Sequence, residues 1–181
     1  EGAGLLYTFN PTGTLSSITY PDQAQAAFFH DALDRLHQMQ DRLGASSYEY
    51  DNVGRITDYT DAQGFTTHYL YDNAGNLTEI TYPDNGRVTY LYDATNRLLS
   101  VRNWLDETQY EEASWQYNAG RLQSFTQFNG ITTTFSYDGA SRLTGLSNSI
   151  ASYQYTLDAN GNRTHVVQAE PLAPIFPASG Q

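Results

Sequence analysis

The sequence contains no cysteine, few charged residues and no long apolar run. Without cysteine the chain forms neither disulfides nor thiolate metal sites. No apolar stretch approaches the roughly 20 residues of a transmembrane helix. Residues 1–9 also lack the basic segment followed by an apolar stretch that marks a signal peptide. We therefore expect no membrane span in this sequence.

Positive charge is scarce, with nine Lys plus Arg against twenty Asp plus Glu and a net charge of −11. Because cationic side chains provide most of the affinity for nucleic acid, we expect no nucleic-acid partner. Aromatic residues, in contrast, are abundant: fifteen Tyr, eight Phe and two Trp make up 14% of the chain. Aromatic side chains favour sheets, so the composition predicts a β-protein.

A repeat of about 20 residues fills the chain, and repeats of this length determine the architecture. Eight repeats align on a position zero occupied by Phe9, His30, Tyr50, Tyr71, Tyr92, Tyr117, Tyr137 and Leu157. Two residues earlier each repeat has an aromatic residue on the same strand face: Tyr7, Phe28, Tyr48, Tyr69, Tyr90, Trp115, Phe135 and Tyr155. One residue after position zero come Asn10, Asp31, Asp51, Asp72, Asp93, Asn118, Asp138 and Asp158, which suit an Asx turn.

The residues after this turn predict a second strand. A residue type that tolerates positive φ comes first, namely Gly13, Asp34, Gly54, Gly75, Asn96, Gly120, Ser141 or Gly161. Five repeats continue with an arginine that can pair with the Asp of its own or the next repeat: Arg35, Arg55, Arg97, Arg121 and Arg142. An aliphatic residue and a second apolar residue then stand three apart, as Leu77 and Ile80 do. Either a β-bulge lies between the two positions or the aliphatic residue belongs to the turn, and we predict the bulge.

Each repeat is therefore predicted to be a β-hairpin, with outer turns such as Asn85-Gly86 joining successive repeats. The fold class is all-β: tandem hairpins in a curved antiparallel strip over residues 1–167, followed by a Pro-rich tail or linker over 168–181. Residues 23–43 also suit a helix, since apolar residues recur there at near-helical spacing and the segment is rich in the helix formers Ala, Leu, Gln and Arg. We predict a hairpin because Phe28, Asp31 and Arg35 keep the register of the repeat.

The segments YEYDNVGRI at 48–56, YLYDNAGNL at 69–77 and FSYDGASRL at 135–143 resemble the YD repeat of the RHS (rearrangement hot spot) family. The resemblance implies a β-strip that spirals into a hollow shell, as in RHS polymorphic toxins, Tc toxin cocoons and teneurins. It further implies a secreted or exported bacterial protein whose partners are a toxin polypeptide cargo or the remainder of the shell. In bacterial members the cargo is released at an Asp-Pro-containing motif, which this sequence lacks, so we expect a fragment of shell wall.

We interpret the motif positions that recur along the chain as structural, and we predict no catalytic residue, cofactor or metal. The motif residues are Tyr48, Tyr50, Asp51, Gly54, Arg55, Tyr69, Tyr71, Asp72, Gly75, Tyr90, Tyr92, Asp93, Arg97, Phe135, Tyr137, Asp138 and Arg142. Calcium ligation by the recurring Asp is a weaker alternative, because one carboxylate per turn supplies too few oxygens. The four histidines, His30, His37, His68 and His165, lack zinc-site spacing.

Two further hypotheses remain open from the sequence. The Tyr-rich face could instead serve a free-standing carbohydrate-binding or adhesion module, since aromatic side chains offer large, stiff contact surfaces. A truncated strip also exposes edge strands that can pair with another copy, so we predict self-association through them.

Overall fold

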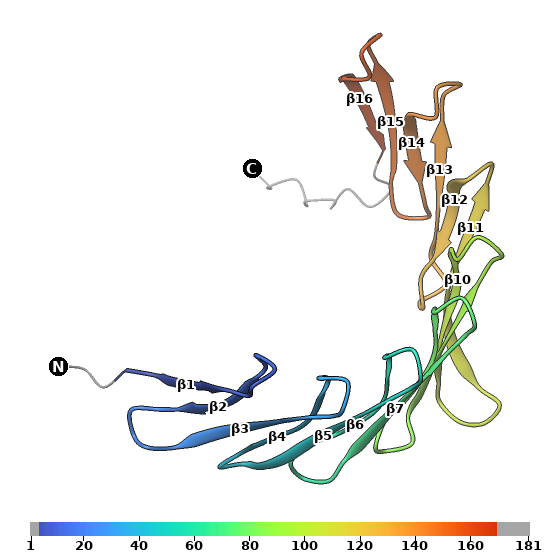
Figure 1. The fold of residues 1–181 in the computed structure, drawn as a ribbon. Helices are drawn as coiled ribbons and strands as arrows, with labels where there is room; N and C mark the ends of the chain where they lie inside the picture. The colour runs from blue at the N-terminus through green and yellow to red at the C-terminus, as the bar shows by residue number, and fades with distance from the viewer. Residues whose placement is uncertain (1–3, 170–181) are drawn as a thin grey trace, which may run out of the picture. The chain divides into compact units, whose positions relative to one another are not determined.

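The computed structural model describes residues 4–169, and these residues form sixteen β-strands (Figure 1). None of them belongs to a helix long and apolar enough to cross a membrane. The strands are β1 (Leu6–Phe9), β2 (Leu15–Thr19), β3 (Gln25–His30), β4 (Leu36–Asp41), β5 (Gly44–Tyr50), β6 (Ile56–Thr60), β7 (Thr66–Tyr71), β8 (Leu77–Thr81), β9 (Arg87–Tyr92), β10 (Leu98–Trp104), β11 (Tyr110–Asn118), β12 (Arg121–Thr126), β13 (Thr132–Tyr137), β14 (Leu143–Ser147), β15 (Ser152–Leu157) and β16 (Arg163–Ala169).

The strands follow one another in the sheet in their order along the chain. The chain divides into two compact parts between Thr89 and Tyr90, and the strand pairs within each part are antiparallel. This confirms the all-β prediction. The competing helix over residues 23–43 does not form, because β3 and β4 pair as a hairpin there. Most of the predicted tail, residues 170–181, lies outside the described residues.

In seven of the eight repeats the turn closes through the Asp or Asn that follows position zero, and in the sixth repeat Asn118 instead pairs directly with Arg121. In the third repeat the Asp51 backbone N–H donates to the Arg55 carbonyl (2.9 Å) and the Gly54 N–H donates to the Asp51 carbonyl (3.1 Å). Gly54 lies at φ 90°, a left-handed conformation that costs glycine little. Asn96 adopts φ 62° at the same position of the fifth repeat, as the sequence predicts.

The predicted bulge is confirmed, and it lies at the start of the second strand of the hairpin. In the fourth repeat Leu70 pairs with Glu79 but Tyr71 pairs with Leu77, so Thr78 is the extra residue. The bulge places Leu77 and Ile80 on the same face despite their spacing of three. Equivalent extra residues follow from the registers of six other hairpins: Ser16, His37, Thr57, Gln123, Thr144 and Thr164.

One face of the sheet carries rows of three side chains: an aromatic, an apolar and a small residue on successive strands. Tyr69 pairs with Ile80, and Ile80 pairs with Val88 on the next strand. The most buried residues of this face are small ones: Ala26, Ser46, Ala113 and Thr133. No large side chain among the described residues is fully buried. The sheet is therefore stabilised by contacts between neighbouring strands and hairpins.

The opposite face is rich in hydroxyl groups. Thr60 and Thr66 hydrogen bond across β6 and β7 (2.9 Å), and Thr126 and Thr132 do so across β12 and β13 (2.8 Å). Such cross-strand pairs of Thr contribute to pairing while leaving a polar surface. The sheet thus has two different faces. We call the face that carries the aromatic rows the aromatic face, and we call the opposite, polar face the hydroxyl face.

Substitution of Gly75, at φ 92°, tests whether the turn conformation limits stability. Gly75→Val should lower the free energy of unfolding by about 1–2 kcal/mol, because a β-branched residue is strained at positive φ. Gly75→Asn should cost much less, since Asn96 adopts this conformation in the fifth repeat. Urea denaturation of both variants measures the difference, and equal losses would contradict the role assigned to the turn.

Candidate functional site

The carboxylate after position zero organises its own turn. Asp51 Oδ1 accepts hydrogen bonds from the backbone N–H groups of Val53 (3.0 Å) and Arg55 (2.9 Å). Its second oxygen, Oδ2, lies 2.6 Å from Arg55 Nε. The same arrangement recurs at Asp31, Asp93 and Asp138. Both oxygens of each carboxylate are therefore engaged within one turn.

The arginine of this turn also reaches the next repeat. The Arg55 guanidinium lies over the Tyr71 ring, 4.6 Å from its centroid, and Nη1 donates to the Asp72 backbone carbonyl (3.1 Å). In the other direction the Tyr71 hydroxyl donates to the Ile56 carbonyl (2.9 Å). These contacts join the Asp of one repeat, through its Arg, to the Tyr and the turn of the next repeat. We call this set of contacts the arginine clasp.

The clasp recurs along the chain. Arg35 lies 4.5 Å from the Tyr50 centroid and donates to the Asp51 carbonyl (3.2 Å), while the Tyr50 hydroxyl donates to the Leu36 carbonyl (2.7 Å). Arg97 covers the Tyr117 ring at 4.5 Å. The sequence prediction that Arg pairs with Asp is therefore sharpened: the partner is the carboxylate of its own repeat and the backbone carbonyl of the next.

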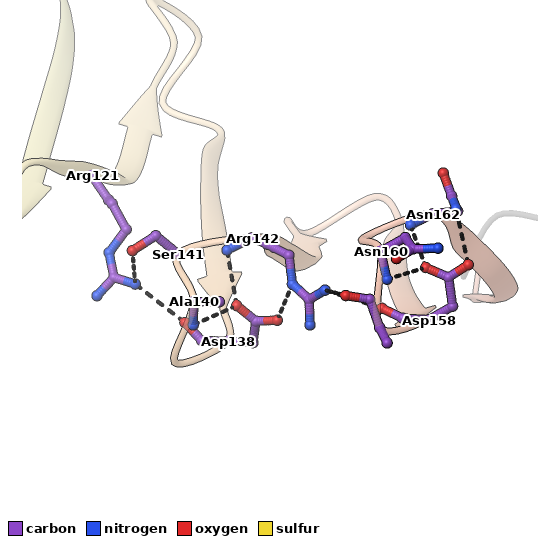
Figure 2. A network of polar contacts seen from close by, with 9 residues as sticks. Arg121, Asp138, Ala140, Ser141, Arg142, Asp158, Asn160 and Asn162 are labelled. Atoms are coloured by element: carbon purple, nitrogen blue, oxygen red, sulfur yellow. Dashed lines mark hydrogen bonds and ion pairs between the residues drawn. The ribbon is translucent and has the colours of Figure 1, made fainter.

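Figure 2 shows the polar contacts of the turns in the last three repeats. Arg142 pairs with the Asp138 carboxylate (2.7 Å) and donates to the Asp158 carbonyl (3.0 Å). Arg121 follows Asn118 and has no Asp in its own turn, but it donates to the Asp138 carbonyl and the Ser141 hydroxyl, both at 3.4 Å. The link to the next repeat is therefore kept where the Asp is replaced.

Asparagine takes the arginine position in two repeats and retains only part of the clasp. The Asn76 amide donates to Asp72 Oδ2 and the Asn162 amide donates to Asp158 Oδ2, both at 2.9 Å. The shorter side chain preserves the hydrogen bond within the turn.

The first aromatic residue of each motif packs against the second strand of its hairpin. Tyr48 pairs with Tyr59, Tyr69 with Ile80, and Phe135 with Leu146. Tyr90 and Tyr92 lie on β9. Asp93 begins the turn that follows, and its backbone N–H donates to the Arg97 carbonyl (2.9 Å). Tyr137 donates its hydroxyl to the Leu122 carbonyl (2.9 Å) under Arg121.

All nine cationic residues of the chain are arginine, and this signal in the composition points to the clasp. A guanidinium is planar, binds a carboxylate with two donors and stacks on an aromatic ring, whereas a lysine ammonium does none of these equally well. At least six arginines lie over tyrosine rings in the described residues: Arg35, Arg55, Arg97, Arg102, Arg121 and Arg163.

The hydrogen bonds of the turns favour the charged form of the Asp residues. The Arg55 backbone N–H, together with the Arg55 guanidinium, lowers the pKa of Asp51 against an opposing effect of burial. The Asn76 side-chain amide is the main cause of the lowered pKa of Asp72. In Asp138 the backbone N–H of Arg142 again lowers the pKa.

The histidines and the remaining acidic residues were the other candidate groups. No three His, Asp or Glu side chains come together as metal ligands within residues 4–169. His68 contacts Asp58 across β6 and β7 on the hydroxyl face. His30 replaces the tyrosine at position zero, and its Nδ1 is buried without a hydrogen bond in the described residues.

Comparison with known families agrees with this geometry. The family model "RHS Repeat" matches residues 30–66, 50–85 and 71–108. Residues 30–108 of the chain are thus similar to RHS repeats. The matched residues include the clasps of Arg35 and Arg55, so the resemblance of the YD motif to this family is confirmed. No curated protein sequence matches the chain.

Solved structures of Tc toxins share the fold of this chain. TcdB2-TccC3 matches with a TM-score of 0.70 and 16% identity over 92% of this chain and 11% of that one. The Photorhabdus luminescens Tc holotoxin pore with the TccC3-D651A mutation matches with a TM-score of 0.68 and 18% identity over 91% of this chain and 10% of that one. The chain thus spans about a tenth of their length.

Replacing one clasp arginine by lysine tests the clasp. Arg55→Lys keeps the charge but loses the stacking on Tyr71 and the hydrogen bond from Nε to Asp51, so the free energy of unfolding should fall by about 1–2 kcal/mol. Arg42→Lys is the matched control, because Arg42 is an exposed residue of an outer turn. Urea denaturation measures both variants, and equal stabilities would refute the clasp as a stabilising contact.

Acid should weaken the RHS repeats through their Asp residues. Asp51, Asp72 and Asp138 have lower pKa values in the folded chain than the ordinary value of 3.8, so their stabilising contribution is present above that value. It is lost as the pH falls through the folded-state pKa values. The thermal midpoint, followed by circular dichroism, should therefore drop steeply below pH 3.8. A midpoint that stays constant from pH 5 to pH 2 would contradict this assignment.

Proposed function

We propose that the chain is a non-enzymatic segment of a β-sheet wall in an RHS-type shell that encloses a polypeptide. The observation that carries this proposal is the arginine clasp, whose arginine links five of the seven pairs of successive repeats without requiring a central core. A structure held together by contacts between neighbours can be extended repeat by repeat into a long wall. The clasp therefore suits a wall better than it suits a compact binding domain.

The similarity to Tc toxin structures supports the same proposal. It covers nine-tenths of this chain within chains about ten times as long. One of those structures is titled TcdB2-TccC3 without hypervariable C-terminal region. By analogy, the partners proposed here are the remainder of a shell and a toxin polypeptide, in a protein secreted or exported by a bacterium.

The chemistry of the motif tyrosines also favours a structural role. The rings of Tyr50, Tyr71 and Tyr137 are covered by guanidinium groups, and their hydroxyls donate to backbone carbonyls. One face of each of these rings is therefore covered, so the carbohydrate-binding alternative is the weaker one. The proposal assigns no catalytic step to the chain. Self-association through edge strands stays a prediction.

Electron cryomicroscopy of the complete protein encoded by the gene tests the proposal. A closed β-sheet wall that contains these repeats and surrounds additional polypeptide density is the expected result. Limited trypsin digestion should leave the enclosed segment intact, and the double variant Arg55→Lys/Arg142→Lys should expose it faster than the control Arg42→Lys. An open strip, or a segment cut equally fast in all three proteins, would contradict the proposal.

A further inference from the structure

The third repeat differs from all others on the aromatic face. Its second apolar position is Tyr59, where the other repeats have aliphatic residues or a phenylalanine: Ile18, Met39, Ile80, Val101, Phe125, Leu146 and Val166. Tyr59 packs against Tyr48 with the ring centroids 5.2 Å apart and an angle of 38° between the rings. This repeat alone therefore places two phenol groups side by side in its aromatic row.

These two rings form part of an open groove. Its volume is about 410 Å³, and it is lined by Tyr48, Ile56, Tyr59, Tyr69 and Tyr71. Grooves of this size are large enough for a small ligand or a single side chain. One wall is the arginine clasp itself, because the Tyr71 ring lies against Arg55. The groove is therefore built on a stabilised part of the sheet.

Three of the lining tyrosines have hydroxyl groups that the fold does not use. The Tyr71 hydroxyl donates to the Ile56 carbonyl, as part of the clasp. The hydroxyls of Tyr48, Tyr59 and Tyr69 form no hydrogen bond within residues 4–169. They leave phenol oxygens available as acceptors beside ring faces that carry no guanidinium.

The chain itself indicates which chemical group fits such a surface. Guanidinium groups lie over its tyrosine rings at 4.5–5.3 Å in repeat after repeat. A cation over a tyrosine face is attracted by the ring, and the net charge of −11 favours a cationic occupant further. A neutral sugar would gain nothing from this charge.

We propose that the groove lined by Tyr48, Tyr59 and Tyr69 binds the guanidinium group of an arginine side chain on a polypeptide partner. The ring faces receive the planar cation, and the phenol oxygens accept its hydrogen bonds. A lysine ammonium fits less well, because it is not planar and holds its hydration shell more strongly. The binding depends on the groove alone, so its failure would leave the proposed shell role untouched.

Titration of the isotope-labelled chain with blocked tripeptides, followed by NMR, tests this proposal. Acetyl-Gly-Arg-Gly-amide should give saturable shifts at the groove residues. The citrulline tripeptide, a neutral analogue of nearly the same shape, should bind at least fivefold more weakly, and the lysine tripeptide should also bind more weakly. Equal binding of the arginine and citrulline peptides, or no saturable shift, would overturn the proposal.

Variants within the groove complete the test. Tyr59→Ile introduces the residue found at this position in the first and fourth repeats, so the fold should be kept, while affinity for the arginine peptide should fall about fivefold. Ile80→Val, in the neighbouring repeat and outside the groove lining, is the control and should not change binding. Tyr69→Phe removes one phenol oxygen that would accept a hydrogen bond. It provides a second measurement of affinity if the Tyr59→Ile variant does not fold. Unchanged affinity in a folded groove variant, or saturable binding of maltotriose in place of the peptide, would refute the assignment.

Discussion

The structure depends on arginine side chains whose guanidinium groups contact two successive turns. Arg55 neutralises the carboxylate of its own turn, covers the tyrosine of the next repeat and donates to the next turn. Because the described residues include no fully buried large side chain, such links add to the strand pairing that fixes each repeat relative to its neighbour. Within a turn, the backbone N–H of the arginine and then its guanidinium lower the pKa of Asp51 and of Asp138.

Much of the fold follows from the sequence because its main elements are local. The two aromatic residues, the Asx turn and the residue with positive φ all lie within ten residues of the sequence. The bulge between Leu77 and Ile80 was predicted because side chains alternate between the two faces of a strand. The register of the repeat also decided correctly against a helix over residues 23–43, where local propensity was ambiguous.

The clasp was harder to foresee because it joins residues 16 or 17 positions apart across two hairpins. The motif allows Arg to pair with either of two Asp residues, and only the geometry shows that the next repeat offers its carbonyl and ring instead. The absence of lysine was the one available signal in the sequence. The groove around Tyr59 was likewise hidden, because a single tyrosine at an apolar position resembles ordinary variation.

A double-mutant cycle on Arg55 and Tyr71 tests the central claim most directly. The free energies of unfolding of the chain, of Arg55→Leu, of Tyr71→Leu and of the double variant give the coupling energy between the two side chains. The clasp predicts a coupling of about 0.5–2 kcal/mol, and about zero for a parallel cycle that pairs Arg55 with the distant Tyr137. Additive losses for Arg55 and Tyr71 would show that the repeats are not held together by the guanidinium.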